Sequence, residues 1–259
     1  MNINYVNLLI LYPLVFLAGF VDSIAGGGGL ISLPAYLFIG LPSHNALATN
    51  KLSSTIGTIF STLRYAKGRA IVYSVGVPSV VGSLIGSHLG ARLALVLSDN
   101  ILKVVLAILI PVAAIIVLIT NPRKSKENSV EDTGSSYGIT KTILVATAIG
   151  FTIGMYDGFF GPGTGTFLII LYVSLLNMDH VSASGTAKVV NLASNIGALV
   201  TFIFGNKVLY SIGLPAAAFG IVGNWLGSGL ALKKGAKVIK PVMLGVLVLL
   251  FIKILSDMV

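Results

Sequence analysis

Four ionisable residues lie within long apolar stretches of the sequence: Asp22, Lys51, Asp157 and Lys188. A charged side chain is costly at the depth of a lipid bilayer, so each of them needs a partner of opposite charge or contact with water. Two overlapping interpretations follow. The residues form two Asp–Lys pairs that hold parts of the protein together, or the lysines face an anion while the aspartates hold the lysines or carry protons.

Each aspartate is followed by a glycine-rich break in an apolar run. The first break consists of residues 26–29, all glycine, and the second consists of residues 161–165, Gly-Pro-Gly-Thr-Gly. Irregular backbone is tolerated at membrane depth only where protein buries it or where it lines a water-filled cavity. A helix that starts at Gly28 or Gly29 directs free N–H groups into the break, which suits an anion. Close helix packing is the alternative role for these glycines.

Small polar residues accompany both lysines. Lys188, Asn191 and Asn195 have the spacing of residues on one helix face, so we expect this face to contact protein or water. The histidines lack the spacing of metal ligands, and neither glycine run continues into a phosphate-binding loop. We expect Asp22 and Asp157 to pair with charges or couple an ion, and we expect no catalytic residue, metal or cofactor. The predicted substrate-binding residues are Gly26, Gly27, Gly28, Gly29, Thr49, Asn50, Lys51, Gly161, Gly163, Thr164, Gly165, Lys188, Asn191 and Asn195.

Composition places these residues in a membrane protein. Hydrophobic residues make up 55% of the chain and charged residues 10%, whereas soluble domains have about 25% charged residues. We therefore predict an all-α integral membrane protein with about 8–10 transmembrane segments. Gly, Pro and charged residues divide the chain into ten apolar segments: 5–25, 30–41, 45–64, 71–97, 101–119, 141–160, 165–177, 183–205, 208–231 and 238–256. The second and the seventh are too short to cross unaided.

The order of residues repeats halfway along the chain. Asp157 follows Asp22 at an offset of 135 residues, and Lys188 follows Lys51 at an offset of 137. Pairs with the second offset also include Pro78 and Pro215, Gly86 and Gly223, and Gly90 and Gly227. We interpret the chain as an internal duplication. Its predicted parts are a first transmembrane repeat (1–120), a cytoplasmic linker (121–138) and a second transmembrane repeat (139–259).

Basic residues cluster in two short loops, at 64–69 and 233–240. The positive-inside rule places both loops in the cytoplasm. Ten crossings put them on one face and give the two five-segment repeats opposite orientations, as in many secondary transporters. Re-entrant short segments would leave eight crossings and put the loops on opposite faces, so we prefer ten. The net charge of +9 therefore reflects topology, and no nucleic-acid partner is expected.

Four motifs together resemble the TauE/SafE family of sulfite exporters and related transporters, in particular its YfcA-like branch: "DSIAGGGGLISLPA", "ATNKLSSTIGT", "YDGFFGPGTGTF" and "GTAKVVNLASNIGAL". The resemblance covers nearly the whole chain. It implies a multi-pass permease for small anions, with sulfite, sulfonates, thiosulfate and organic carboxylates as substrate classes. The chain has Ala187 where related proteins often have Thr before the second lysine.

The function expected from residues and resemblance together is secondary transport of a small anion by two inverted halves in the cell membrane. An anion-selective channel is the alternative. An enzyme is disfavoured because the sequence lacks a Ser/His/Asp set, a metal-spaced cluster and neighbouring paired carboxylates. The expected partners are the lipid bilayer, the anion, a coupling proton or cation, and a second copy bound through glycine-rich helix faces such as 82–90.

Overall fold

The computed structural model describes residues 5–102, 104–105, 108, 138–235, 237–238 and 241. The fifth and tenth predicted segments and the linker lie almost entirely outside these residues. The other eight predicted segments are all helices: α1 (Tyr5–Ala25), α2 (Gly29–Phe38), α3 (Ser43–Lys67), α4 (Tyr73–Val96), α6 (Ile139–Phe159), α7 (Thr164–Leu175), α8 (His180–Phe204) and α9 (Tyr210–Lys234). The described part of the chain contains no strand.

The helix lengths fit a membrane protein. Five helices, α1, α4, α6, α8 and α9, are long and apolar enough to cross a bilayer. Helix α3 has 25 residues but is more polar, because it carries Lys51 and a series of Ser, Thr and Asn residues. Helices α2 and α7 have 10 and 12 residues, or about 15 and 18 Å at 1.5 Å per residue. The prediction of an all-α integral membrane protein is confirmed.

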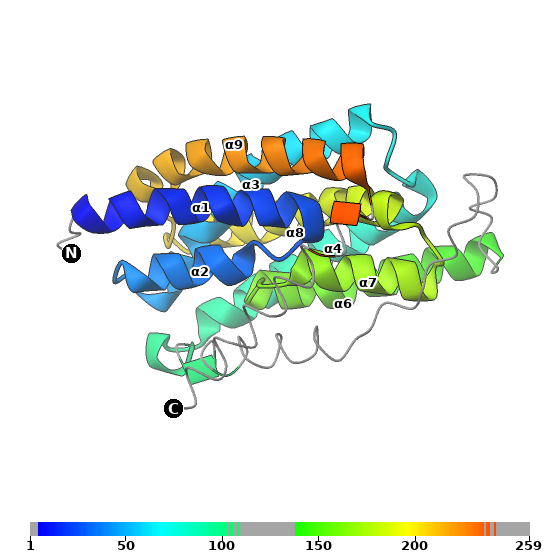
Figure 1. Ribbon diagram of the computed structural model, residues 1–259. Helices are drawn as coiled ribbons and strands as arrows, with labels where there is room; N and C mark the ends of the chain where they lie inside the picture. Colours follow the sequence, from blue (N-terminus) through cyan, green and yellow to red (C-terminus); the bar gives the residue numbers. More distant parts are fainter. Residues whose placement is uncertain are drawn as a thin grey trace.

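Each glycine break is the tip of a helical hairpin. In Figure 1, α1 runs from the left toward the centre and α2 returns to the left, whereas α6 starts at the right and α7 returns to the right. The two tips touch: a side chain on Gly26 or on Gly165 would overlap the backbone of the other. The Thr166 hydroxyl also donates a hydrogen bond of 2.7 Å to the Ala25 carbonyl. The two hairpins therefore enter from opposite ends and meet at the breaks.

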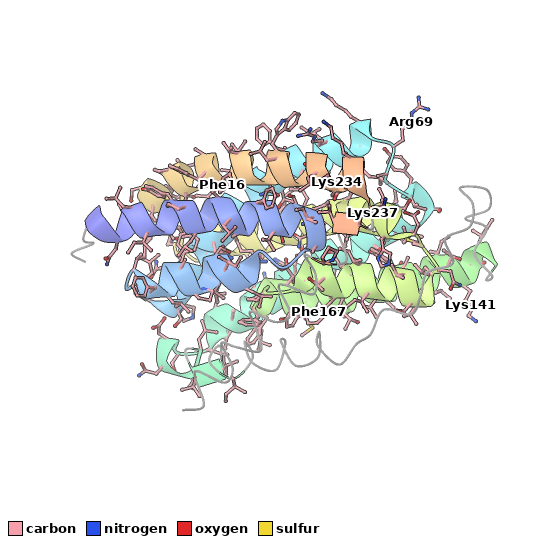
Figure 2. The ribbon with its side chains drawn as sticks, in the orientation of Figure 1. Phe16, Arg69, Lys141, Phe167, Lys234 and Lys237 are labelled. Atoms are coloured by element: carbon pink, nitrogen blue, oxygen red, sulfur yellow. The ribbon has the colours of Figure 1, made fainter. Side chains whose placement is uncertain are left out.

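Glycines let the long helices approach one another closely. A side chain on Gly86 of α4 would collide with the Phe151 carbonyl of α6, and one on Gly223 of α9 would collide with the Phe16 carbonyl of α1. Figure 2 shows Phe16 on α1, alongside α9. Gly82 and Gly90 of α4 approach α6 as closely, and Gly227 of α9 approaches α1 as closely. Because these faces are used within the chain, contact between copies would need another surface.

The contact between α4 and α6 and the contact between α9 and α1 involve residues at corresponding positions of the sequence repeat. Gly86 and Gly223 are 137 residues apart, and their carbonyl partners on Phe151 and Phe16 are 135 apart. These are the offsets found in the sequence. They are what two copies packed in the same manner would give, and they support the duplication, which stays a prediction.

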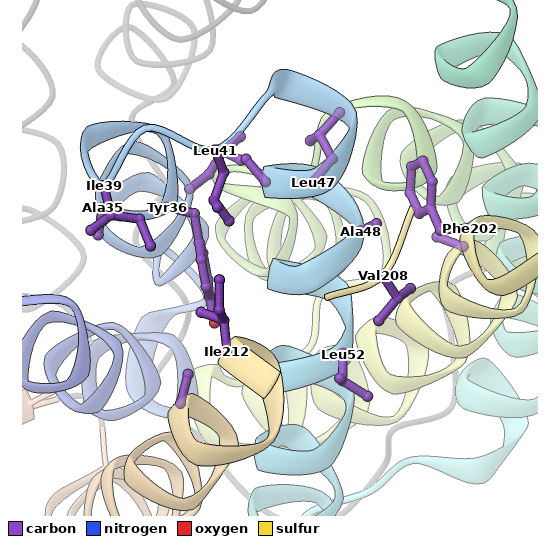
Figure 3. Packing of buried hydrophobic residues seen from close by; sticks show 14 of the residues in the cluster. Ala35, Tyr36, Ile39, Leu41, Leu47, Ala48, Leu52, Phe202, Val208 and Ile212 are labelled. Atoms are coloured by element: carbon purple, nitrogen blue, oxygen red, sulfur yellow. The ribbon is translucent and has the colours of Figure 1, made fainter. Parts of the chain in front are cut away.

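A buried apolar cluster fixes the first hairpin to the rest of the molecule (Figure 3). Tyr36 of α2 is fully buried and its hydroxyl donates a hydrogen bond of 2.8 Å to Ser53 of α3. Leu47 of α3, Phe202 of α8 and Ile212 of α9 belong to the same cluster. Helices from both halves therefore share one core around α2.

The two basic loops lie at the same end of the molecule. A side chain on Gly68, after α3, would touch Leu232 near the end of α9. In Figure 2, Arg69 and Lys234 are found toward the same end, away from the N-terminus shown in Figure 1. Ten crossings require this arrangement, but two hairpins that each enter and leave at one end give it as well, so the number of crossings stays a prediction.

Single cysteines in this cysteine-free chain test the topology. We expect Lys67→Cys and Lys234→Cys, both at exposed positions, to react with an impermeant maleimide only from the cytoplasmic side. Pro42→Cys, at an exposed position in the loop between α2 and α3, should react only from the outside. Labelling of Lys67→Cys and Lys234→Cys from opposite sides would contradict the shared end.

Candidate functional site

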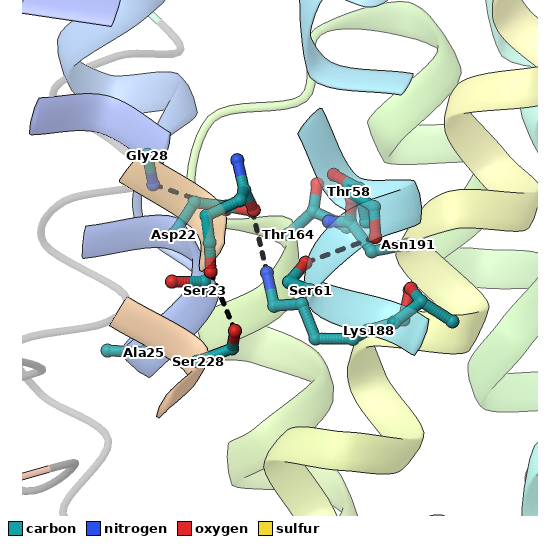
Figure 4. Close-up of polar contacts among 12 residues, drawn as sticks. Asp22, Ser23, Ala25, Gly28, Thr58, Ser61, Thr164, Lys188, Asn191 and Ser228 are labelled. Atoms are coloured by element: carbon teal, nitrogen blue, oxygen red, sulfur yellow. Dashed lines mark hydrogen bonds and ion pairs between the residues drawn. The ribbon is translucent and has the colours of Figure 1, made fainter. Parts of the chain in front are cut away.

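The four ionisable residues form two ion pairs, and both pairs join the two halves of the chain. Lys51 Nζ lies 2.7 Å from Asp157 Oδ2, and Lys188 Nζ lies 2.6 Å from Asp22 Oδ2. Figure 4 shows the second pair between α1 and α8. Each aspartate comes from the helix before a glycine break, and each lysine comes from the third helix of the opposite half. Each pair therefore joins an aspartate of one half to a lysine of the other half, an arrangement that we call crosswise.

Asp157 is held by several donors. Its Oδ2 accepts a hydrogen bond of 2.6 Å from the Ser194 hydroxyl in addition to the Lys51 contact, and its Oδ1 accepts one of 2.8 Å from Thr164. Thr164 is the first residue of α7. The carboxylate thus lies at the start of α7, where the positive end of the helix dipole favours a negative charge.

Asp22 occupies the corresponding place at the start of α2. Its Oδ1 accepts a hydrogen bond of 3.3 Å from the N–H of Gly28, the N-cap residue of α2. A side chain on Gly28 would collide with Asp22 itself, so glycine is needed for this approach. Both short helices therefore begin next to a carboxylate supplied by the preceding helix.

The polar face predicted on α8 is present. The Asn195 amide donates a hydrogen bond of 2.6 Å to the Asn191 side chain, and the Asn195 oxygen accepts one of 2.9 Å from Lys51 Nζ. Lys51 is therefore bound by a carboxylate and an amide at once. Its side chain is only 4% exposed, so these contacts replace water around the ammonium group.

A cavity reaches this site and is lined by residues of α1, α2, α3, α6, α8 and α9 and of both breaks. Nine of the sixteen predicted residues line it: Asp22, Gly28, Gly29, Asn50, Lys51, Asp157, Gly161, Asn191 and Asn195. The other seven are not among the lining residues: Gly26, Gly27, Thr49, Gly163, Thr164, Gly165 and Lys188. The structure thus brings together residues from segments more than 130 positions apart.

The predicted residues outside the lining have other contacts. Gly26 and Gly165 pack against each other. The Thr49 hydroxyl accepts a hydrogen bond of 3.1 Å from the Leu209 N–H, and the Lys188 side chain is 0% exposed beneath Asp22. A direct role of these residues in binding stays a prediction.

Asn224, which is not among the predicted site residues, also lines the cavity. Its amide lies where side chains on Gly19 of α1 or Gly57 of α3 would be, and it donates a hydrogen bond of 3.0 Å to the Gly220 carbonyl. The Oδ1 atoms of Asn224 and Asn50 are buried without a hydrogen-bond partner in the part of the chain that the structure describes. Its position in the sequence, as a single amide side chain within the apolar segment 208–231, is the feature that could have indicated it.

The site combines opposite charges with small polar groups. Two cationic and two anionic side chains are paired between the helices, and small polar groups surround them. Within the described ranges there is no group of His, Asp or Glu residues suited to hold a metal ion. A charged ligand entering this cavity would have to compete with the existing ion pairs.

The crosswise pairing predicts a specific pattern of stability. Lys51→Gln and Asp157→Asn should each destabilise the protein by about 3–5 kcal/mol, because each leaves a buried charge unpaired. The double variant should lose less than the sum of the two, with a coupling energy of about 1–3 kcal/mol. Unfolding in detergent, followed for the four proteins of this double-mutant cycle, measures that energy.

The matched control combines Lys51→Gln with Asp22→Asn, which are not partners. These two substitutions should be more nearly additive. A larger coupling for Lys51 with Asp22 than with Asp157 would contradict the pairing.

The comparisons with known proteins agree with this architecture. The family model described as "Sulfite exporter TauE/SafE" matches residues 11–254. The chain is 37% identical to the probable membrane transporter protein ORF9 of Sinorhizobium sp., over 96% of this chain and 93% of that protein. It is 34% identical to the probable membrane transporter protein YfcA of Escherichia coli K12, over 96% and 89%. No solved structure matches the chain. A match over nearly the whole length shows that the chain belongs to the sulfite exporter TauE/SafE family of membrane transporters.

Proposed function

We propose that the protein is a secondary transporter for a small anion, most specifically sulfite, a sulfonate or another sulfur-containing or carboxylate anion. The observation that carries the proposal is the cavity that reaches Lys51 at membrane depth. The family's name supplies sulfite as the first substrate to test. Its relatives are named only as probable membrane transporters, which supports transport in general.

The anion binds in the cavity between Lys51 and the glycine break at the start of α2. Lys51 supplies positive charge, Asn191 and Asn195 supply side-chain amides, and Gly28 and Gly29 let the anion approach the start of α2. The dipole of a helix start favours an anion there. To reach Lys51, the anion shares the ammonium group with Asp157, its present partner.

Transport follows from movement of the two halves about this site. The hairpins enter from opposite ends and touch at Gly26 and Gly165. Rocking of the halves about this contact exposes the site to one side of the membrane at a time, as expected for inverted repeats. The present cavity borders the Lys51–Asp157 pair, and the opposite arrangement would open beside Lys188.

Purified protein in proteoliposomes tests the function. We expect uptake of radiolabelled sulfite or methanesulfonate to be saturable and to be accelerated by unlabelled substrate inside, which is counterflow. Failure to move sulfite, a sulfonate or a short carboxylate under any ion gradient would refute the proposal. Large currents without counterflow would indicate an anion-selective channel instead.

Neutral replacement of the site lysines should impair transport. Lys51→Gln and Lys188→Gln remove the positive charge that compensates the anion and leave a carboxylate unpaired, so both the transport rate and the substrate affinity should fall about tenfold or more. Lys51→Arg should retain partial activity, because charge is kept while shape changes. Initial uptake rates over a range of substrate concentrations give both quantities.

Lys207 provides the matched control, because it lies in the loop between α8 and α9, away from the cavity lining. Lys207→Gln should transport with nearly the parent's affinity. Lys51→Gln and Lys188→Gln proteins that insert normally and keep the parent's affinity would show that the lysines are structural.

A further inference from the structure

The two carboxylates of the site are not equivalent. Asp157 accepts close contacts from three side chains, those of Lys51, Ser194 and Thr164. Asp22 has one close partner, Lys188, and one long hydrogen bond of 3.3 Å from the backbone. The Asp22 side chain is 17% exposed, whereas that of Asp157 is 3% exposed.

The charge of the site explains why this difference matters. The four side chains sum to zero charge, so a bound monoanion would give the site a net charge of −1 at membrane depth. An uncompensated charge there is costly. Lys188 is sealed from the cavity at 0% exposure, so a compensating cation from solution would reach Asp22 first.

The groups around Asp22 leave its carboxylate accessible to a proton from the cavity. Lys188 of α8 contacts it directly, and the Lys51–Asp157 pair lies elsewhere on the cavity wall. Tyr65 of α3 is close by, but its hydroxyl donates a hydrogen bond of 2.8 Å to the Ser23 carbonyl. No further ionisable side chain lines the cavity among the residues that the structure describes.

We propose that Asp22 is the proton-coupling residue and that one proton enters with each monoanion. This inference rests on the proposed transport function. The proton binds to a carboxylate oxygen of Asp22, Lys188 keeps its charge, and that charge now balances the anion. A neutral carboxyl is a weaker acceptor, so the Gly28 N–H is released toward the anion. The loaded site is neutral, and so is the empty site once the proton and the anion have left together.

Asp157 has a different role in this mechanism. Protonation there would weaken hydrogen bonds from two hydroxyl groups and the contact with Lys51. Asp157 therefore stays ionised and positions Lys51. Although they hold equivalent places in the sequence, the two aspartates should give different transport phenotypes.

Methanesulfonate is the probe for the test, because it stays ionised at neutral pH and carries no proton of its own. Proteoliposomes loaded with radiolabelled methanesulfonate and the pH dye pyranine report anion efflux and proton efflux together. We expect about one proton per anion. Clamping the membrane potential with potassium and valinomycin at different values should leave the efflux rate unchanged, because the cycle is electroneutral.

Three variants separate proton coupling from anion binding. Asp22→Asn should lose proton movement, and the acceleration of efflux by a pH gradient should fall at least tenfold. Methanesulfonate counterflow should persist at a reduced rate. Asp22→Glu should restore proton movement. Asp157→Glu is the matched control, because it keeps the net charge of the site: its counterflow should fall as Lys51 is displaced, but the residual efflux should still move one proton per anion.

Each outcome decides the inference. Net efflux of methanesulfonate without proton movement, or efflux that depends on the membrane potential, would overturn proton coupling, and counterflow would show that the transport function is intact. Proton movement that survives in Asp22→Asn, or that is kept in Asp22→Glu and lost in Asp157→Glu, would overturn the assignment to Asp22. Absence of counterflow for every anion tested would overturn the transport function, and the inference with it. If Asp22→Asn does not fold, the proton-to-anion ratio of Asp22→Glu decides, and a ratio well below one refutes the proposal.

Discussion

Pairing of four charges between apolar helices is the constraint on which the rest of this structure depends; three of them are buried and the fourth, Asp22, is 17% exposed. A lysine or an aspartate in that position must be paired, because the unpaired charge is costly. The chain meets the requirement crosswise, with Lys51 on Asp157 and Lys188 on Asp22. Neither half can satisfy its own charges in this arrangement, so the pairs tie the halves together at the centre of the molecule.

Small residues make the crosswise contacts geometrically feasible. The two hairpin tips meet because Gly26 and Gly165 leave no side chain between them. The long helices approach to backbone contact at Gly86 and Gly223, and the start of α2 reaches Asp22 because Gly28 has no Cβ. Glycine therefore serves two purposes in this chain. It allows close packing of the long helices, and it allows the backbone to approach a carboxylate closely.

The two ion pairs are related by the sequence repeat but differ in their surroundings. The ion pairs are equivalent in sequence offset, yet the cavity borders Lys51, Asp157 and Asp22 and excludes Lys188. Membership of the TauE/SafE family establishes a membrane transporter architecture. The cavity wall carries paired charges and side-chain amides.

The sequence by itself determined the membrane class, eight helices within a few residues of their bounds, both glycine breaks and the four ionisable residues of the site. These features are local: apolar length, glycine runs and isolated charges are legible within one segment. Only the tertiary structure decided that Lys51 pairs with Asp157, that Thr49 and Lys188 lie outside the cavity lining, and that Asn224 belongs to it. Spacing along one helix gives the face on which a side chain lies, but its partner depends on which distant helix packs there. That choice is made by the close glycine contacts and by the cost of leaving any buried charge alone.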